Sequence, residues 1–143
     1  MSKAHTETYR PELSHLGDNE LITWLSTAKL DDLKVIPGLG MKTEEALKSY
    51  TQNCENPITS AYALVGLFIN MKQAHMGRID HINMFYDFLK KAGVHGSIHT
   101  IIRAVAERAN LTFPGLYDHS DWVSHMNVNE KVIIEQVSAT RKS

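Results

Sequence analysis

The sequence predicts an all-α protein, a compact bundle of about five core helices with an N-terminal arm and a C-terminal extension. Three observations support this class. Apolar residues recur at three- and four-residue spacing along most of the chain, which is the period of a helix that faces a core. Glycines and prolines separate these segments. The 143 residues, 43% of them hydrophobic, suffice for one core but not for two large domains.

The N-terminal part is expected to hold a flexible arm and two helices. Residues 1–16 contain Pro11 and little apolar periodicity, so we expect them to lie outside the core. Asp18 can cap a first helix. Thr27 can cap a second, which Pro37 ends because proline supplies no N–H and restricts the residue before it. The inward positions of this second helix are Leu30, Leu33 and Ile36.

Four further helices are expected over residues 42–50, 59–71, 82–92 and 97–109. The 59–71 segment is apolar on almost every side, so we expect it to be the buried centre of the bundle. A last segment, residues 130–137, has an apolar cluster that fits helix or strand, and helix is preferred.

These elements divide the chain into three parts. Residues 1–16 are the arm, residues 17–111 form one helical domain, and residues 112–143 form a C-terminal extension that is expected to be partly helical. No internal repeat or low-complexity tract interrupts this division.

Composition excludes several classes of protein. No apolar run reaches the roughly 18 residues of a membrane span, and the polar start of the chain is not a signal-peptide core. Cys54 is the single cysteine, so neither an intrachain disulfide nor a thiolate-rich metal site can form. We therefore expect a soluble intracellular protein without membrane insertion. Lysine and arginine (15) nearly balance aspartate and glutamate (16), so any nucleic-acid site must be local.

The candidate chemistry lies in one turn, residues 36–40, which reads Ile-Pro-Gly-Leu-Gly and which we call the glycine turn. Its two glycines lack side chains, so a phosphate can approach the backbone N–H groups of the turn and of the helix that follows. Lysines on either side add positive charge, and such a cradle reads no bases. The candidate DNA-binding residues here are Lys34, Gly38, Leu39, Gly40, Met41, Lys42 and Thr43. The alternative is a plain turn that packs two helices.

Residues 28–50 resemble the helix-hairpin-helix motif of non-sequence-specific DNA-binding proteins. Four segments extend this likeness: the Gly-Leu-Gly at residues 38–40 with Leu47 downstream, Ala-Tyr-Ala-Leu-Val-Gly-Leu-Phe at 61–68, Phe-Tyr-Asp-Phe-Leu-Lys at 85–90, and Gly-Val-His-Gly at 93–96. In this order and spacing they are similar to the barrier-to-autointegration factor family, a small helical fold with one such hairpin.

The resemblance implies a homodimer that carries one hairpin on each outer face, binds double-stranded DNA without sequence preference and bridges two duplexes. It also implies a groove that binds a helical partner domain at the nuclear envelope, and a chromatin-associated, non-enzymatic protein of nucleus and cytoplasm without cofactor or metal. His95 and Gly96 join the DNA-binding set because they lie in the family's second glycine turn. The residues assigned to the dimer or partner groove are Tyr62, Gly66, Phe68, Phe85, Phe88 and Leu89. The three phenylalanines among them fit equally well as core residues.

The chain also departs from the family. Glu44 and Glu45 stand where hairpins carry small or basic residues, and two carboxylates near the cradle weaken its positive potential. The family's several cysteines are reduced to one, and neither end of the chain has a clear counterpart. A second hypothesis is therefore a protein-protein adaptor that keeps the fold but has lost DNA binding.

Other chemistries fit less well. The glycine turn lacks the third glycine and the preceding strand of a dinucleotide site, and Met41 replaces the glycine that a nucleotide phosphate loop needs. His95 and His99 lie four apart, but no third metal ligand is evident. Cys54 has no neighbouring histidine or basic cluster that would activate its thiol. None of these patterns indicates an enzyme.

Overall fold

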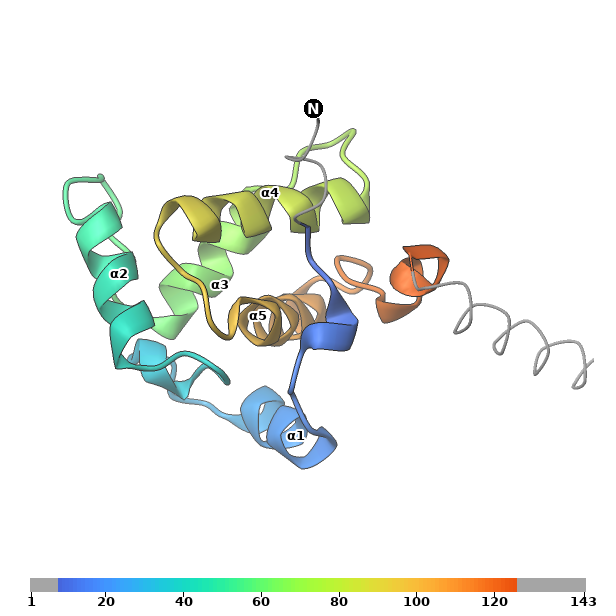
Figure 1. Cartoon of the computed structure of the whole chain (residues 1–143), viewed down its shortest axis with the longest axis horizontal. Helices are drawn as coiled ribbons and strands as arrows, with labels where there is room; N and C mark the ends of the chain where they lie inside the picture. Colours follow the sequence, from blue (N-terminus) through green and yellow to red (C-terminus); the bar gives the residue numbers. More distant parts are fainter. Residues whose placement is uncertain (1–7, 126–143) are drawn as a thin grey trace, which may run out of the picture.

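The structure is a computed structural model that describes residues 8–125 (Figure 1). In this part of the chain it contains helices and no strand, so the predicted all-α class is confirmed. The α-helices are α1 (Asp18–Ser26), α2 (Met41–Thr51), α3 (Ala61–Asn70), α4 (Arg78–Lys91) and α5 (Ile98–Thr112). The described chain also has three short 3-10 helices: η2 (Pro11–Leu13) before α1, η3 (Leu33–Val35) between α1 and α2, and η4 (His119–His125) after α5. The predicted segment at residues 130–137 lies outside the described residues.

Helix α5 is the centre of the bundle. It packs against α1, α3, α4 and η2, and Figure 1 shows it end-on with these elements around it. Its buried side chains are Ile98, Thr100, Ile101, Ile102, Ala104, Val105, Ala106 and Ala109. Helix α3, which we expected to be the buried centre, buries only one face, because Tyr62 is 61% exposed and Gly66 is exposed. An apolar sequence therefore did not distinguish the central helix from one beside it.

Local chemistry explains where several helices begin and end. The Ser60 hydroxyl accepts a hydrogen bond of 3.1 Å from the Ala63 N–H, which caps α3 at its first turn. Helix α4 has Asp80 in its first turn and Lys90 and Lys91 in its last, a distribution that matches the helix dipole. Within residues 8–125 no helix is long and apolar enough to cross a membrane.

The helix predicted between residues 27 and 36 is wrong. Thr27 ends α1 instead of capping a new helix, because its N–H donates to the Trp24 carbonyl at 3.2 Å. The Asp32 carboxylate then accepts from the Lys34 N–H at 2.9 Å and so caps the single turn η3. Only a few residues separate this cap from Pro37, which leaves room for one 3-10 turn. The first helix of the predicted helix-hairpin-helix motif is thus one turn long.

The prediction that residues 1–16 lie outside the core is wrong for the part that the structure describes. Residues 8–16, which we call the N-terminal strap, cross the start of α5 (Figure 1). Tyr9 is 1% exposed, and Leu16 is also buried. Tyr9 of the strap contacts Tyr117 and Trp122, which are buried, as is Leu116, although all three follow α5. Strap and residues 116–122 together form what we call the chain-end clasp, so the core extends beyond the predicted domain of residues 17–111.

Candidate nucleic-acid interface

The glycine turn is a tight reversal between η3 and α2. Gly38 has a φ of 85°, in the left-handed region that favours glycine, and the Leu39 N–H closes the turn on the Ile36 carbonyl at 3.0 Å. A Cβ on Gly38 would lie 3.0 Å from Thr100 Cγ2 and 3.2 Å from Ser97 Cβ. The turn therefore rests directly on the start of α5, and this close approach also requires a glycine.

The outer side of the turn presents unpaired backbone donors. Gly40 precedes α2 with φ −98°, no side chain caps it, and a Cβ built there would meet nothing within 4 Å. The first helical hydrogen bond runs from the Glu44 N–H to the Gly40 carbonyl at 3.0 Å, so the N–H groups of residues 41–43 have no acceptor among the described residues. Leu39 differs: its side chain is buried and its N–H is used inside the turn. It belongs to the scaffold of the site and donates nothing to a ligand.

The second glycine turn lies next to the first. Because Gly38 touches Ser97, the loop that holds His95 and Gly96 lies beside the glycine turn, as the predicted DNA-binding set requires. Ser97 precedes α5 without forming a side-chain cap. The start of α5 therefore lies close to that of α2, but the Ile98 N–H already donates to the His95 carbonyl at 2.8 Å.

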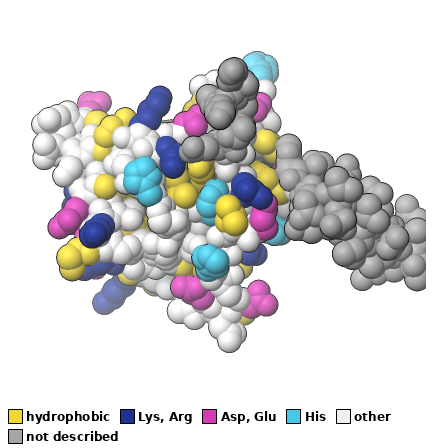
Figure 2. Space-filling model, in the orientation of Figure 1, with side chains coloured by type: hydrophobic (Ala, Val, Ile, Leu, Met, Phe, Trp, Pro, Cys, Tyr) yellow, Lys and Arg dark blue, Asp and Glu magenta, His cyan; other side chains and the backbone are white. Residues whose placement is uncertain are grey.

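Charges around the turn are mixed. Lys34 and Lys42 are exposed, as predicted. Glu44 is paired with Lys48 at 3.2 Å, and only 14% of its side chain is exposed, so its charge is partly neutralised. Glu45 is exposed and has no ion pair within the described part of the chain. Figure 2 shows basic and acidic side chains interspersed over the visible face, without one continuous basic patch.

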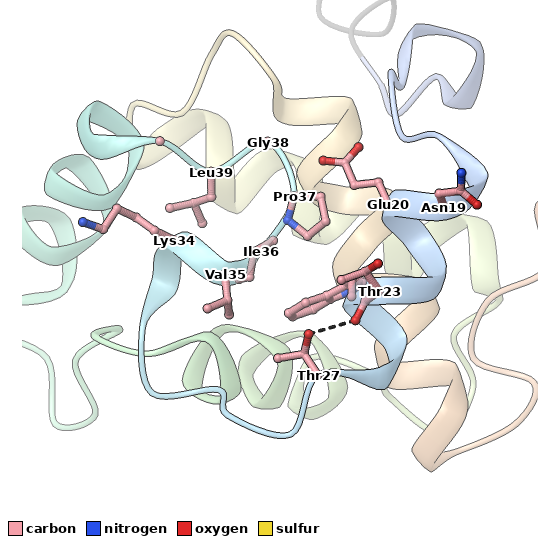
Figure 3. Close-up of a pocket in the computed structure, with 12 residues that line it drawn as sticks. Asn19, Glu20, Thr23, Thr27, Lys34, Val35, Ile36, Pro37, Gly38 and Leu39 are labelled. Atoms are coloured by element: carbon pink, nitrogen blue, oxygen red, sulfur yellow. Dashed lines mark hydrogen bonds between the residues drawn. The ribbon is translucent and has the colours of Figure 1, made fainter.

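A groove of about 640 Å³ lies between α1 and the glycine turn (Figure 3). Glu20 points from α1 toward the turn. Lys34 also lines this groove, but the end of its side chain extends away from Glu20, toward α2. The turn thus has an acidic side facing α1 and a basic side facing α2. Sequence reasoning missed the acidic side, because Glu20 is far from the turn in the chain and only the packing of α1 brings it there.

The residues assigned to a dimer or partner groove separate into two groups. Phe68, Phe85 and Leu89 are fully buried and form core contacts; the Phe68 and Phe85 rings meet edge-on with centroids 5.1 Å apart. Side chains buried in this way present no surface to a partner. Tyr62 and Gly66 on α3 are exposed. The sixth residue, Phe88, is partly buried, and its ring lies 5.7 Å from that of Tyr50.

The two histidines that lie four positions apart, His95 and His99, have different surroundings. His95 is exposed, whereas the Nδ1 of His99 accepts a hydrogen bond of 3.1 Å from the Arg10 N–H. Between residues 8 and 125 no group of three or more histidine, cysteine, aspartate or glutamate side chains could hold a metal ion.

The chain matches no protein-family model, no curated protein and no solved structure. The likeness to the barrier-to-autointegration factor family therefore stays a prediction from sequence. What supports a function is the geometry of the glycine turn.

Proposed function

We propose that the protein binds the phosphate backbone of double-stranded DNA through the glycine turn, without sequence preference and without catalysis. The observation that carries this proposal is the open outer side of the turn, where Gly40 leaves space and the N–H groups of residues 41–43 have no acceptor in the described structure. Lys34, whose side chain extends toward α2, and the exposed Lys42 in the first turn of α2 add positive charge. Backbone donors and lysines hold a phosphate but do not distinguish bases.

The proposed contact is small. A few N–H groups and one or two lysines neutralise about two to four phosphates, so one site binds one duplex weakly and its affinity falls gently with salt. Bridging follows if the protein is a homodimer, since a second site then acts at high effective concentration on a second or looped duplex. Tyr62 and Gly66 leave an exposed face on α3 for such a dimer. The work of the protein is architectural, in nucleus and cytoplasm.

A second candidate function is that of an adaptor that binds proteins alone, including a helical partner domain at the nuclear envelope. Glu20 beside the turn and the exposed Glu45 favour it, because both carboxylates repel a phosphate. The two functions differ in one measurable quantity, the salt-dependent affinity for random duplex DNA.

The central experiment compares Gly40→Glu with Gly77→Glu. Both glycines precede a helix without a side-chain cap, both have extended backbone, and a Cβ at either would meet nothing within 4 Å. Both variants therefore fold, and both change the charge equally. We expect Gly40→Glu to reduce affinity for a random duplex at least tenfold and Gly77→Glu to leave it within about twofold. Equal affinity of the two variants would contradict the glycine turn as the binding site.

A charge-reversal pair separates the two candidate functions. Glu45→Lys removes an exposed carboxylate near the turn, whereas Glu55→Lys makes the same change beyond the far end of α2. Because Glu44 is already paired with Lys48, the single change at Glu45 tests the local potential more directly than a change at both positions. We expect Glu45→Lys to bind random DNA several-fold more tightly and with a steeper salt dependence, and Lys42→Glu to bind more weakly on every sequence. No DNA binding by any of these proteins would favour the adaptor.

A further inference from the structure

Two backbone N–H groups of the N-terminal strap donate hydrogen bonds to adjacent side chains of α5. The Arg10 N–H donates to His99 Nδ1 at 3.1 Å, and the His15 N–H donates to Thr100 Oγ1 at 2.9 Å. Tyr9 anchors the strap further, because its ring lies edge-on to Trp122 with centroids 5.1 Å apart. Two acceptors in the first turn of α5 are thus among the contacts that hold the strap.

The His99 acceptor exists only while the imidazole is neutral at Nδ1. A backbone N–H can only donate, so a proton on Nδ1 would place two donors against each other. The charged and titratable groups that face His99 are Arg10 and Glu12 from the strap and Lys90 from α4, and its ring also lies near those of Tyr9 and Tyr86. Burial lowers the pKa of His99 below 6.5, Arg10 and Lys90 lower it further, and Glu12 raises it. At neutral pH the acceptor is therefore present, and it is lost as the pH falls through this lowered pKa.

The other histidine of the clasp responds differently. The Tyr9 and Tyr117 hydroxyls share a hydrogen bond of 2.9 Å, and the Tyr117 hydroxyl also meets His119 Nδ1 at 2.9 Å. A hydroxyl can donate or accept, so this chain of hydrogen bonds persists with or without a proton on His119 Nδ1. His99 is therefore the group whose protonation breaks a contact of the strap.

Thr100 connects the strap to the glycine turn. Its Oγ1 accepts from the strap while its Cγ2 lies against Gly38, and it is 5% exposed. Without the strap, this oxygen can turn to the carbonyl of the residue three or four positions earlier, which is the second rotamer that threonine adopts in helices. That rotation moves the methyl group on which the turn rests.

We propose that the strap, residues 8–16, is an acid-released element that holds the glycine turn in place: protonation of His99 frees the strap, lets Thr100 rotate and loosens the turn at Gly38. The effect of this release on DNA binding rests on the proposed function, whereas the release itself does not. The control is His99→Asn, whose amide oxygen takes the place of Nδ1 and accepts the Arg10 N–H at every pH.

Hydrogen exchange of the full chain at about pH 7.5 and about pH 5, corrected for intrinsic rates, tests the strap. In the wild type and in His119→Asn, we expect protection of the bonded amides of residues 8–16 to fall roughly tenfold at the lower pH, while α3 stays protected. The amides of Ile36 and Leu39, which are hydrogen-bonded in the folded turn, should follow. In His99→Asn, protection should be equal at both values. An unchanged strap in the wild type, release that persists in His99→Asn, or an unchanged turn after release would each overturn the proposal. Loss of protection in α3 as well would show general unfolding and overturn it too.

A second measurement addresses the DNA. We compare the affinity of the wild type for a random duplex with that of His99→Asn, because the ratio of the two cancels the effect of protonating the other histidines. We expect this ratio to be about three- to fivefold lower at about pH 5 than at about pH 7.5. A constant ratio with a released strap would overturn the link to binding. If neither protein binds DNA at any pH, the proposed function fails, whereas the exchange experiment still decides whether the strap is released by acid.

Discussion

The glycine turn and the chain-end clasp both rest on the start of α5, but they are built from different parts of the chain. In the turn, the features that matter are backbone ones: the positive φ of Gly38, the open space at Gly40 and the unpaired N–H groups of α2. In the clasp they are large side chains, with Tyr9 and Trp122 at 1% and 3% exposure.

This difference teaches how the two regions should respond to mutation. A substitution in the clasp removes buried apolar surface and is expected to weaken the whole fold. A substitution on the outer side of the turn removes nothing from the core and is expected to change only what binds there. Gly38 lies between these cases, because it belongs to the turn but touches α5.

The largest expected effect is in the clasp. Tyr9→Ala removes a buried ring that packs against Trp122 and a hydroxyl bonded to Tyr117, so we expect the free energy of unfolding to fall by about 3 kcal/mol. Tyr50→Ala is the control, since Tyr50 is 48% exposed, and it should lose less than about 1 kcal/mol. Urea denaturation followed by circular dichroism measures both. Equal losses would show that the strap is no part of the core.

The second effect separates the two glycines of the turn. Gly38→Ala places a Cβ 3.0 Å from Thr100 Cγ2 at a positive φ, and we expect it to destabilise the protein by about 1–3 kcal/mol. Gly40→Ala has extended backbone and open space, so it should stay within about 0.5 kcal/mol of the wild type. The same denaturation experiment compares them. A destabilised Gly40→Ala would mean that the outer side of the turn is not open.

The third effect is acid destabilisation that arises in the clasp and the core. Burial lowers the pKa values of His81, His99 and His119 below 6.5, so the unfolded chain binds protons more readily than the folded one. Stability is then full above about pH 6.5 and falls as the pH drops toward the lowered values. We expect Tm to be ~5 °C lower at about pH 5 than at about pH 7.5. Calorimetry at both pH values measures the two Tm values. A higher Tm at the lower pH would contradict the lowered pKa values of these histidines.

The smallest effect concerns a glycine with no conformational role. Gly66 lies inside α3, and a Cβ there would meet nothing within 4 Å. In the monomer, Gly66→Ala should therefore stabilise the helix by ~0.5–1 kcal/mol. If two copies meet closely at this face, the same change should weaken the dimer. Sedimentation at several concentrations, beside denaturation, measures the two effects. Stabilisation together with an unchanged dimer would place the dimer contact elsewhere.

Local patterns in the sequence predicted most helices but not their arrangement. The inward position of Leu47 and the apolar face of α5 follow from spacing alone, and both are buried as expected. The strap could not be predicted, because Tyr9 meets Tyr117 across 108 positions and no periodicity precedes it. The helix expected before Pro37 failed for a local reason that the sequence did contain, since Asp32 is a capping residue close to a proline.

The candidate site was predicted in the same uneven way. Glycines at 38 and 40 indicate an open turn from their chemistry alone. The space is open at Gly40, whereas a Cβ at Gly38 would press against Thr100. Which N–H groups remain unpaired depends on the closing hydrogen bond of Leu39, and the acidic wall at Glu20 depends on how α1 packs. Both features depend on tertiary structure, and the position of Glu20 determines which side of the turn can face a phosphate.

The hydroxyl pair of the clasp also has a mechanical meaning. Because the Tyr9 and Tyr117 hydroxyls lie 2.9 Å apart, a residue near the start of the described chain is tied directly to one that follows α5. Tension applied across residues 8 and 125 would therefore pull on the clasp before it reaches the helices behind it.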